Sequence, residues 1–318
     1  MDLDRASDAL SFPTASLVPG AAAIAPDHAF DVSIPGVSAT PKGTLGSIAF
    51  DRFGQLYVPQ TYADGLLFQY DALHLDASGP NAFHFTLYDR MQMATAVAID
   101  HRGQPFVAIR GNGPTSTSEG TTILNFPALA EGDPPTETGT AHPCSESLLD
   151  VQDLAFDKDD DLWISRSGVD HRIMRADAAS LQAEHVWSPG LTLSRVYGGA
   201  LAFDAEGNLW AADGAQVVVF AAADLVGSGS RDVAPRSIFT AGLTRAQGLA
   251  FDAAGNLWVV DPFATVPTGS ASVVYELAAA DLKQAGAHAL VPITQLSVPS
   301  FVRGIAFDPP PAGLPFGG

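Results

Sequence analysis

The sequence predicts an all-β fold, a single six-bladed β-propeller of four-stranded blades. Three features lead to this expectation: a short phrase that recurs six times, a turn and second apolar stretch after the copies, and two chain ends that supply complementary parts of one repeat. The composition agrees, since 47% of the 318 residues are hydrophobic and the 30 glycines and 23 prolines suit a chain with many tight turns.

The recurring phrase is a short apolar run that ends in aspartate. Its copies are Gly46–Asp51, Thr95–Asp100, Gln152–Asp157, Gly199–Asp204, Gln247–Asp252 and Arg303–Asp308. The terminal aspartates lie 47 to 57 residues apart, so repeat units start near residues 46, 95, 152, 199, 247 and 303. This period fits one four-stranded propeller blade per repeat.

A hairpin is expected at each phrase. The second strands are clearest at Gly207–Asp213 and Gly255–Asp261, where they follow an Asp-x-x-Gly-Asn turn. In such a turn aspartate bonds the backbone two residues on, and glycine supplies a positive φ. Third and fourth strands follow, for example at 218–225 and 235–240. The pattern therefore predicts four consecutive antiparallel strands in each unit.

The two chain ends are expected to build one blade together. The sixth unit stops after its second strand, and residues 10–34 contain the missing third and fourth strands, at Leu10–Leu17 and Ala29–Ile34. Pairing the ends closes the ring and removes exposed sheet edges. We therefore expect residues 1–318 to form one domain without an internal boundary.

Charge and composition limit the classes of partner. The net charge of −19 opposes nucleic acid and anionic membranes as partners. No apolar run approaches the roughly 18 residues of a membrane span, and the acidic start lacks a signal-peptide pattern. Few lysines and many Ser, Thr, Gly and Pro residues favour an exported bacterial protein over a cytoplasmic one. The single cysteine, Cys144, excludes an intrachain disulfide, and we expect a monomer.

The repeat unit Gly-Leu-Ala-Phe-Asp-x-x-Gly-Asn-Leu-Trp-Val-x-Asp resembles that of NHL-repeat propellers. It is also similar to the senescence-marker/gluconolactonase and streptogramin lyase-like propellers, and the likeness covers nearly the whole chain. The resemblance implies a six-bladed propeller with a site at one rim of its central channel. It does not imply one activity, because propellers host many functions on the same scaffold.

Candidate site residues follow from the register of the blades. Strand one is innermost, and its start lies at the same rim as the end of strand two, so both positions surround the mouth of the channel. The candidates at the start of strand one are Thr95, Gln152, Asp153, Gln247 and Arg303, and those at the end of strand two are Gln60, Arg166, Asp213 and Asp261.

The residue types at these positions do not favour a metal site or a catalytic site. The resemblance to gluconolactonase-like enzymes implies carboxylate and amide metal ligands in the first ring, but Gln152, Gln247 and Arg303 stand there. Asp213 and Asp261 are weak candidates for a divalent cation such as Ca²⁺, and capping of neighbouring loops is the favoured interpretation. The histidine and glutamate of streptogramin lyase-like members have no counterpart. We interpret the acidic turn Asp157–Asp161 as a solvated turn, and the alternative is that its carboxylates bind a calcium ion.

Two long loops favour a binding function. Residues 111–122 and 262–272 are rich in Ser, Thr and Gly, and sixfold symmetry would place them opposite each other on the mouth rim. The favoured hypothesis is a non-catalytic NHL-like propeller that binds a protein, peptide or glycan there. The alternative is a lactonase, another hydrolase, a lyase or a strictosidine synthase-like enzyme. It would act on a small molecule in the central channel, with or without a divalent metal.

Overall fold

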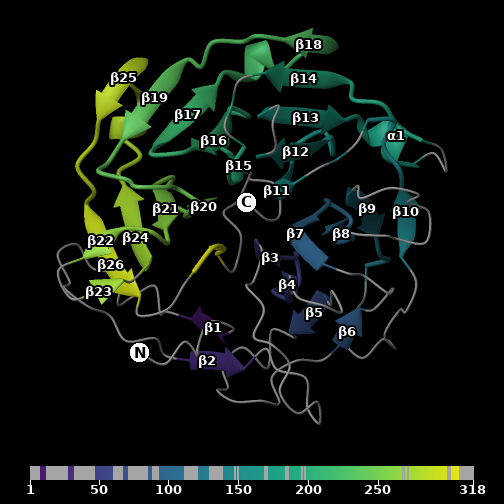
Figure 1. Ribbon diagram of the computed structural model, residues 1–318, viewed down its shortest axis with the longest axis horizontal. Helices are drawn as coiled ribbons and strands as arrows, with labels where there is room; N and C mark the ends of the chain where they lie inside the picture. Colours follow the sequence, from purple (N-terminus) through teal and green to yellow (C-terminus); the bar gives the residue numbers. More distant parts are fainter. Residues whose placement is uncertain are drawn as a thin grey trace.

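The computed structural model describes residues 8–11, 28–31, 47–59, 67–70, 85–87, 93–110, 121–128, 139–146, 148, 150–167, 171–182, 186–194, 196, 198–266, 269–270, 272–298 and 302–307. Within them, five sheets of four or five strands surround a common centre (Figure 1). This arrangement is a β-propeller, and the predicted all-β fold is confirmed. No helix of the described residues is long and apolar enough to cross a membrane.

Each blade runs outward from the centre in chain order. The first blade contains β3 (Ala49–Phe50), β4 (Leu56–Pro59), β5 (Leu67–Tyr70) and β6 (Phe85–Leu87). The second blade contains β7 (Met93–Ile99), β8 (Pro105–Arg110), β9 (Thr121–Asn125) and β10 (Thr140–His142). The third contains β11 (Val151–Phe156), β12 (Leu162–Arg166), β13 (Arg172–Ala176) and β14 (Leu191–Ser194). The fourth contains β15 (Leu201–Phe203), β16 (Leu209–Asp213), β17 (Gln216–Phe220) and β19 (Ser237–Thr240). The fifth contains β20 (Gly248–Phe251), β21 (Leu257–Asp261), β24 (Ser272–Leu277) and β26 (Thr294–Val298).

The prediction of six closed, four-stranded blades is wrong. The described residues form five blades, and residues 302–307, which hold most of the sixth phrase, contain no strand. The predicted N-terminal strands exist as β1 (Asp8–Ser11) and β2 (His28–Asp31), but they pair with each other in a two-stranded sheet. The sequence offers a reason: the sixth phrase runs into Pro309-Pro310-Pro311 instead of a Gly-Asn turn, and proline cannot donate to a strand ladder.

The segment 302–307 nevertheless packs against the fifth blade. Its Val302, Ile305 and Phe307 contact the cluster around Trp258, with the rings of Phe307 and Trp258 5.8 Å apart. The Val302 N–H donates to Ser272 Oγ at 2.8 Å. In Figure 1 this short yellow segment lies beside β20 and β21, toward the centre.

The predicted hairpin turn forms as expected. In the fourth blade, Asp204 Oδ1 accepts the N–H groups of Glu206 and Asn208 at 3.1 and 2.8 Å, and Oδ2 accepts the Trp210 indole N–H at 2.8 Å. Gly207 supplies the positive φ of 80°. Asp157 and Asp252 hold Trp163 and Trp258 in the same way. Each aspartate therefore links the turn to the second strand.

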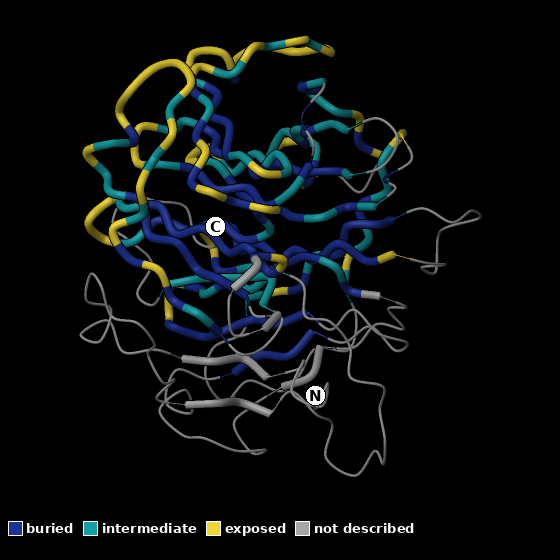
Figure 2. Tube along the Cα trace, turned by 60° about the vertical axis from the view of Figure 1, so that its left-hand side comes forward, coloured by how far each residue is buried: buried dark blue, intermediate teal, exposed yellow. Residues whose placement is uncertain are grey.

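The cores lie between neighbouring blades. Trp210 illustrates this packing, since its ring lies 5.4 Å from Phe239 in its own blade and 5.4 Å from Phe251 in the next. Figure 2 shows the strands as mostly buried and the outer connections as exposed. Apolar burial between blades is thus the main force that holds the described ring together.

Two blades carry a fifth strand from the blade that follows. β18 (Gly229–Arg231) lies between β17 and β19 in sequence but pairs in parallel with β14 of the third blade. Likewise β25 (Gly286–Ala289), which precedes β26, pairs in parallel with β19 of the fourth blade. A parallel bridge between Cys144 and Trp187 joins the second and third blades in a similar way. Each of these connections covers the outer edge of the preceding blade.

Candidate functional site

The first residue of the repeat phrase is a β-bulge position. In β11, Val151 pairs with Arg166 and Asp153 with Ser165, so Gln152 has no residue directly opposite it. In β7, the same shift lies between Ala94 and Ala96 and leaves out Thr95. Bulges bend a strand and redirect a side chain, and they are frequent beside binding sites.

The fourth and fifth blades use the same geometry at the corresponding residue. The Gln247 N–H donates to Val260 O at 2.8 Å, although Val260 already pairs with Gly248. Ala212 O accepts from Gly199 N at 3.1 Å, and Ala212 N donates to Ala200 O at 2.9 Å. The bulges thus place half-buried Thr95, Gln152 and Gln247 at the starts of three inner strands. We call these three residues the bulge ring.

The bulge ring consists of neutral hydrogen-bonding groups. Thr95 Oγ1 donates to Ala108 O at 3.3 Å, and Gln152 Nε2 donates to Asp150 O at 3.2 Å. In both cases a hydrogen bond to a backbone carbonyl fixes the orientation of the side chain. An amide has two donor hydrogens and a carbonyl acceptor, so further bonds to a ligand remain possible for this residue type.

Asp153 lies directly after the bulge and is 4% exposed. Its Oδ2 accepts the Leu201 N–H at 2.8 Å, and its carboxylate also bonds the Ser47 hydroxyl. Ser47 Oγ in turn accepts the Val97 N–H at 3.1 Å. Burial raises the pKa of Asp153 to about 6, although its hydrogen bonds act in the opposite direction. Asp153 and Ser47 thus link inner strands of successive blades.

Asp213 and Asp261 hold loops. Asp261 is fully buried; its Oδ2 accepts the N–H groups of Thr244 and Arg245, and its Oδ1 accepts that of Phe263 at 3.0 Å. Asp213 Oδ2 accepts from Gln216 Nε2 at 2.7 Å, across its own turn. The described residues contain no group of three or more His, Cys, Asp or Glu side chains that could hold a metal ion.

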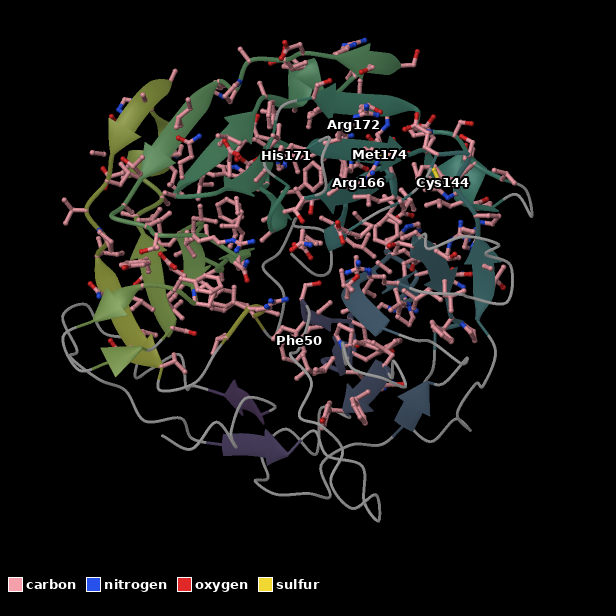
Figure 3. All side chains as sticks on the ribbon, viewed as in Figure 1. Phe50, Cys144, Arg166, His171, Arg172 and Met174 are labelled. Atoms are coloured by element: carbon pink, nitrogen blue, oxygen red, sulfur yellow. The ribbon has the colours of Figure 1, made fainter. Side chains whose placement is uncertain are left out.

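Arg166 is the last residue of β12, where it pairs with Val151 and Arg172. It is 5% exposed, and its Nη1 lies 3.8 Å from Met174 Sδ. Arg172 is its cross-strand partner and contacts Glu146 Oε2 at 3.5 Å. Figure 3 shows Arg166, Arg172 and Met174 close together. Burial raises the pKa of nearby Cys144 to about 11, which makes this thiol a poor nucleophile at neutral pH.

Arg303 lies against the start of β20. Its carbonyl oxygen approaches Gly248 so closely that a Cβ there would lie 2.5 Å from it. Burial and the nearby Arg245 guanidinium lower the pKa of Arg303. Arg245 Cζ lies 5.4 Å from the centroid of the Phe263 ring. Arg245 thus lies against Phe263, and the backbone of Arg303 lies against the start of β20 in the fifth blade.

Some predicted site features lie elsewhere or outside the described residues. Gln60 and residues 111–120 of the first long loop are outside them. The second long loop carries a small hairpin of β22 (Thr265–Val266) and β23 (Gly269–Ser270). The predicted position of the two loops opposite each other depended on sixfold symmetry, which the five blades do not support.

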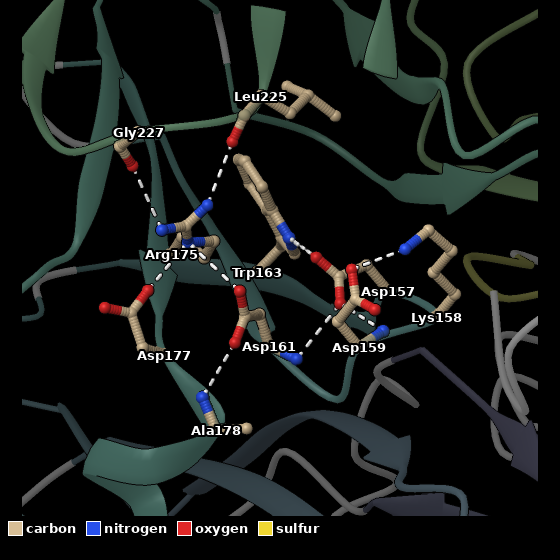
Figure 4. Close-up of polar contacts among 10 residues, drawn as sticks. All are labelled: Asp157, Lys158, Asp159, Asp161, Trp163, Arg175, Asp177, Ala178, Leu225 and Gly227. Carbon is tan, nitrogen blue, oxygen red and sulfur yellow. Dashed lines mark hydrogen bonds and ion pairs between the residues drawn. The ribbon is translucent and has the colours of Figure 1, made fainter. Parts of the chain in front are cut away.

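The acidic turn 157–161 is held together by its own contacts (Figure 4). Asp157 accepts two backbone N–H groups and the Trp163 indole, and Asp161 accepts the Ala178 N–H at 2.8 Å. Asp159 pairs with Lys158, and Asp160 pairs with His101 of the second blade. These carboxylates therefore stabilise the turn and its contacts with neighbouring segments.

Sequence patterns did not reveal Ser47, Arg245 or Phe263 as site residues. Ser47 follows the first position of its phrase, the place that Asp153 takes in the third repeat, and that correspondence was an available signal. Arg245 and Phe263 lie outside the phrase, in connections of unequal length. Their proximity arises because Asp261 binds both backbone segments.

Comparisons with known proteins show the fold. No family model matches the sequence, and no curated protein matches it. Among solved structures, the chain is similar to a luciferin-regenerating enzyme, with a TM-score of 0.52, 13% identity and 84% of each chain covered. It is also similar to streptogramin B lyase, with a TM-score of 0.50, 10% identity, and 76% of this chain and 68% of that chain covered.

A third similar structure is a chain of the mitotic checkpoint complex, with a TM-score of 0.50, 14% identity, and 91% of this chain and 80% of that chain covered. Identities this low establish the architecture alone. The chain is therefore a β-propeller, and the resemblance to propeller proteins that its repeats indicated is confirmed at the level of the fold.

Proposed function

We propose that this chain is a non-catalytic propeller that binds a peptide or glycan at the mouth of its central channel. The observation that carries the proposal is the bulge ring, because the inner strands of the second, third and fifth blades repeat the same local geometry with neutral polar side chains. Hydroxyl and amide groups of a peptide or glycan are suitable partners for threonine and glutamine. A rigid scaffold with polar groups directed to one opening is a common form of ligand site.

The hydrogen bonds that the nearby carboxylates of Asp153 and Asp261 already make support a binding function over a catalytic one. Asp261 accepts three backbone N–H groups, and Asp153 bonds both Leu201 and Ser47. Hydrogen bonds that occupy the acceptor sites of a carboxylate leave fewer of them for a metal ion or a substrate, so both side chains are weaker candidates for those roles. The similar chain of the mitotic checkpoint complex is an example of this fold in a protein that is part of a complex.

The test compares wild-type protein with the Gln152→Ala/Gln247→Ala double variant on peptide and glycan arrays. We expect a set of ligands whose Kd rises at least tenfold in the double variant, about 1.4 kcal/mol. Gln284→Ala is the matched control, since Gln284 is exposed in an outer connection. Ligands that bind the double variant as tightly as the wild type would contradict the proposal.

The raised pKa of Asp153 favours a second candidate, an enzyme of the lactonase, lyase or related kind. A buried carboxylate with a pKa of about 6 is suited to general-base catalysis near neutral pH. The luciferin-regenerating enzyme and streptogramin B lyase show that similar folds carry catalysis. Here Asp153 would act as the base, and Arg303 or Arg166 would stabilise developing negative charge.

A panel of lactones and esters tests this alternative, with and without Ca²⁺. Catalysis by Asp153 predicts a rate that rises as the pH increases through about 6 and falls at least a hundredfold in Asp153→Asn. Unchanged turnover in the variant would exclude Asp153 as the base.

A further inference from the structure

The hairpin turns at the rim opposite the mouth display side chains that the turns themselves do not use. In each of the five blades, the aspartate that ends the phrase accepts the N–H of the residue two positions later, at 2.8 to 3.1 Å. The two residues between this aspartate and the positive-φ residue, which we call the tip, are exposed in every blade. The five tips are Arg52 and Phe53, His101 and Arg102, Lys158 and Asp159, Ala205 and Glu206, and Ala253 and Ala254. Because one turn accepts all of these pairs, its formation does not explain the side chains at any tip.

The tips of the first and second blades bring together arginine and an exposed aromatic ring. Arg52 Cζ lies 4.8 Å from the centroid of the Phe53 ring, and Phe53 is 51% exposed. Arg52 Nε also lies 4.0 Å from the point that a Cβ on Gly103 would occupy, so its guanidinium reaches the turn that contains Arg102. We call Arg52, Phe53 and Arg102 the basic tip patch.

The charges of the basic tip patch are not neutralised by ion pairs. Within the part of the chain that the structure describes, neither arginine forms one. The nearby carboxylates of Asp51 and Asp100 are 1% and 6% exposed, so they lie beneath the turns. At the third tip, by contrast, Lys158 pairs with Asp159 at 2.6 Å. In a protein of net charge −19, the patch is thus a local exception.

The backbone of the patch is fixed before any partner binds. In both turns, one carboxylate oxygen of the aspartate accepts two N–H groups, at 2.8 to 3.0 Å. The second turn is also attached to the third blade, because Asp160 Oδ1 accepts the His101 N–H at 3.2 Å and Oδ2 contacts the His101 ring. A surface with a fixed backbone loses less conformational freedom when it binds.

We propose that the basic tip patch binds a short acidic segment of a partner protein, in which carboxylates lie beside an apolar side chain. Arginine offers paired N–H donors to a carboxylate, and stacking on an aromatic ring leaves these donors free at the edge of the guanidinium. The exposed ring of Phe53 provides apolar contact area between the charges. This surface is separate from the mouth and does not depend on the ligand proposed there.

A short segment suits the patch better than an extended polyanion. Beyond the first two tips, the same rim carries Asp159, Asp160 and Glu206. These carboxylates repel a nucleic acid or an anionic membrane that extends across the ring, and the net charge adds to the repulsion. A peptide of a few residues can contact two neighbouring tips and avoid the acidic ones.

The test uses an array of hexapeptides in which aspartate or glutamate alternates with apolar residues, and a second array with the matching amides. Fluorescence anisotropy then gives the Kd of the peptides that bind. We expect wild-type protein to bind acidic peptides about tenfold more tightly than their amide counterparts, and sodium chloride to weaken this binding. Arg52→Gln/Arg102→Gln should raise the Kd about tenfold. Phe53→Ser should also raise it, while the salt dependence remains.

Arg236→Gln/Lys283→Gln is the matched control, because it removes the same charge from exposed positions in outer connections of the fourth and fifth blades. It should keep the wild-type Kd. An equal rise in the Kd of this control would overturn the proposal, as would the absence of acidic peptides that bind the wild type. Tighter binding of a DNA duplex than of any peptide would also overturn it. So would self-association of the wild type that the Arg52→Gln/Arg102→Gln variant loses, because a second copy of the chain would then occupy the patch.

A measurement on the wild type keeps the test decisive if the double variant fails to fold. On titration with the tightest acidic peptide, the amide NMR signals of Gly54 and Gly103 should shift, because these residues follow the two tips. Unchanged signals at both positions would overturn the proposal. Ligands of the mouth should bind Arg52→Gln/Arg102→Gln as tightly as wild type, so the two sites are tested independently.

Discussion

Asp160 occupies a turn position that is glycine in the neighbouring repeats. Gly54, Gly103, Gly207 and Gly255 have φ values of 77°, 85°, 80° and 79°, and Asp160 has 61°. A left-handed conformation disfavours a residue with a Cβ, although aspartate tolerates it better than most. The compensating feature in this blade is the contact between Asp160 and His101.

The first prediction separates these two effects. Asp160→Gly removes the backbone strain and Asp160→Ala retains it, while both lose the His101 contact. We expect the glycine variant to have a free energy of unfolding about 1 kcal/mol above that of the alanine variant. Urea denaturation measures the difference, and an alanine variant of equal or greater stability would refute it.

Asp153 provides the second prediction at this scale. Its folded-state pKa of about 6 is above the ordinary 3.8, so the fold favours its protonated form. Its contribution to stability is therefore greatest below pH 4, declines as the pH rises from about 4 to 6, and is constant above that. The decline amounts to roughly 3 kcal/mol at most.

Comparison with Asp153→Asn isolates this effect from other carboxylates. Burial also raises the pKa values of Asp51 and Asp161, so the wild-type curve alone is not diagnostic. The stability of Asp153→Asn relative to wild type should increase between pH 4 and 6. Parallel stability curves for the two proteins would contradict the assigned pKa.

At the scale of elements, β18 and β25 distinguish the third and fourth blades from a simple four-stranded repeat, because each is a parallel fifth strand from the next blade. Arg175 in β13 secures the connection that leads to β18, because its Nη atoms donate to Leu225 O at 2.9 Å and Gly227 O at 3.1 Å (Figure 4). Its Nε also contacts Asp177 and Asp161, at 2.8 and 3.3 Å. The guanidinium is thus a link between the third and fourth blades.

Removing that link should loosen β18 in preference to the rest of the fourth blade. In Arg175→Met, which keeps an unbranched apolar stem, we expect amide hydrogen exchange at Gly229–Arg231 to accelerate at least tenfold, while β16 stays protected. Arg236→Met is a suitable control, since Arg236 is exposed in the same blade. Uniform acceleration across the blade would instead indicate general destabilisation.

At the scale of the whole molecule, Gly248 joins the segment 302–307 to the fifth blade. The equivalent phrase position is alanine in the second and fourth repeats, as Ala96 and Ala200, so an inner strand accepts alanine there. In the fifth blade, a Cβ would lie 2.5 Å from Arg303 O and 3.0 Å from Val260 Cγ2. The need for glycine at position 248 therefore arises from the packing of the segment 302–307 and not from the strand itself.

Gly248→Ala should displace the segment 302–307. We expect a loss of about 1–3 kcal/mol in the free energy of unfolding, because overpacking forces the backbone to shift. Trp258 fluorescence should change as Phe307 moves away from its ring. A variant with wild-type stability and fluorescence would show that the segment does not depend on this contact.

The local parts of the fold were predictable from the sequence. The repeat phrase determined the inner strands, and the Asp-x-x-Gly-Asn turn determined the hairpins. The bulges at Thr95, Gln152 and Gln247 were not predicted, although they fall on the first residue of the phrase. These features depend on residues close together in the chain, so their hydrogen bonds and hydrophobic spacing are visible in the repeat itself.

Tertiary structure decided what depends on distant segments. Residues 302–307 contain no strand, although they hold most of the sixth phrase. The parallel fifth strands, the Ser47–Asp153 contact and the packing of Phe307 on Trp258 all join residues far apart in sequence. A repeat pattern carries no information about such contacts, because they form only when packed blades bring their connections and ends to one rim.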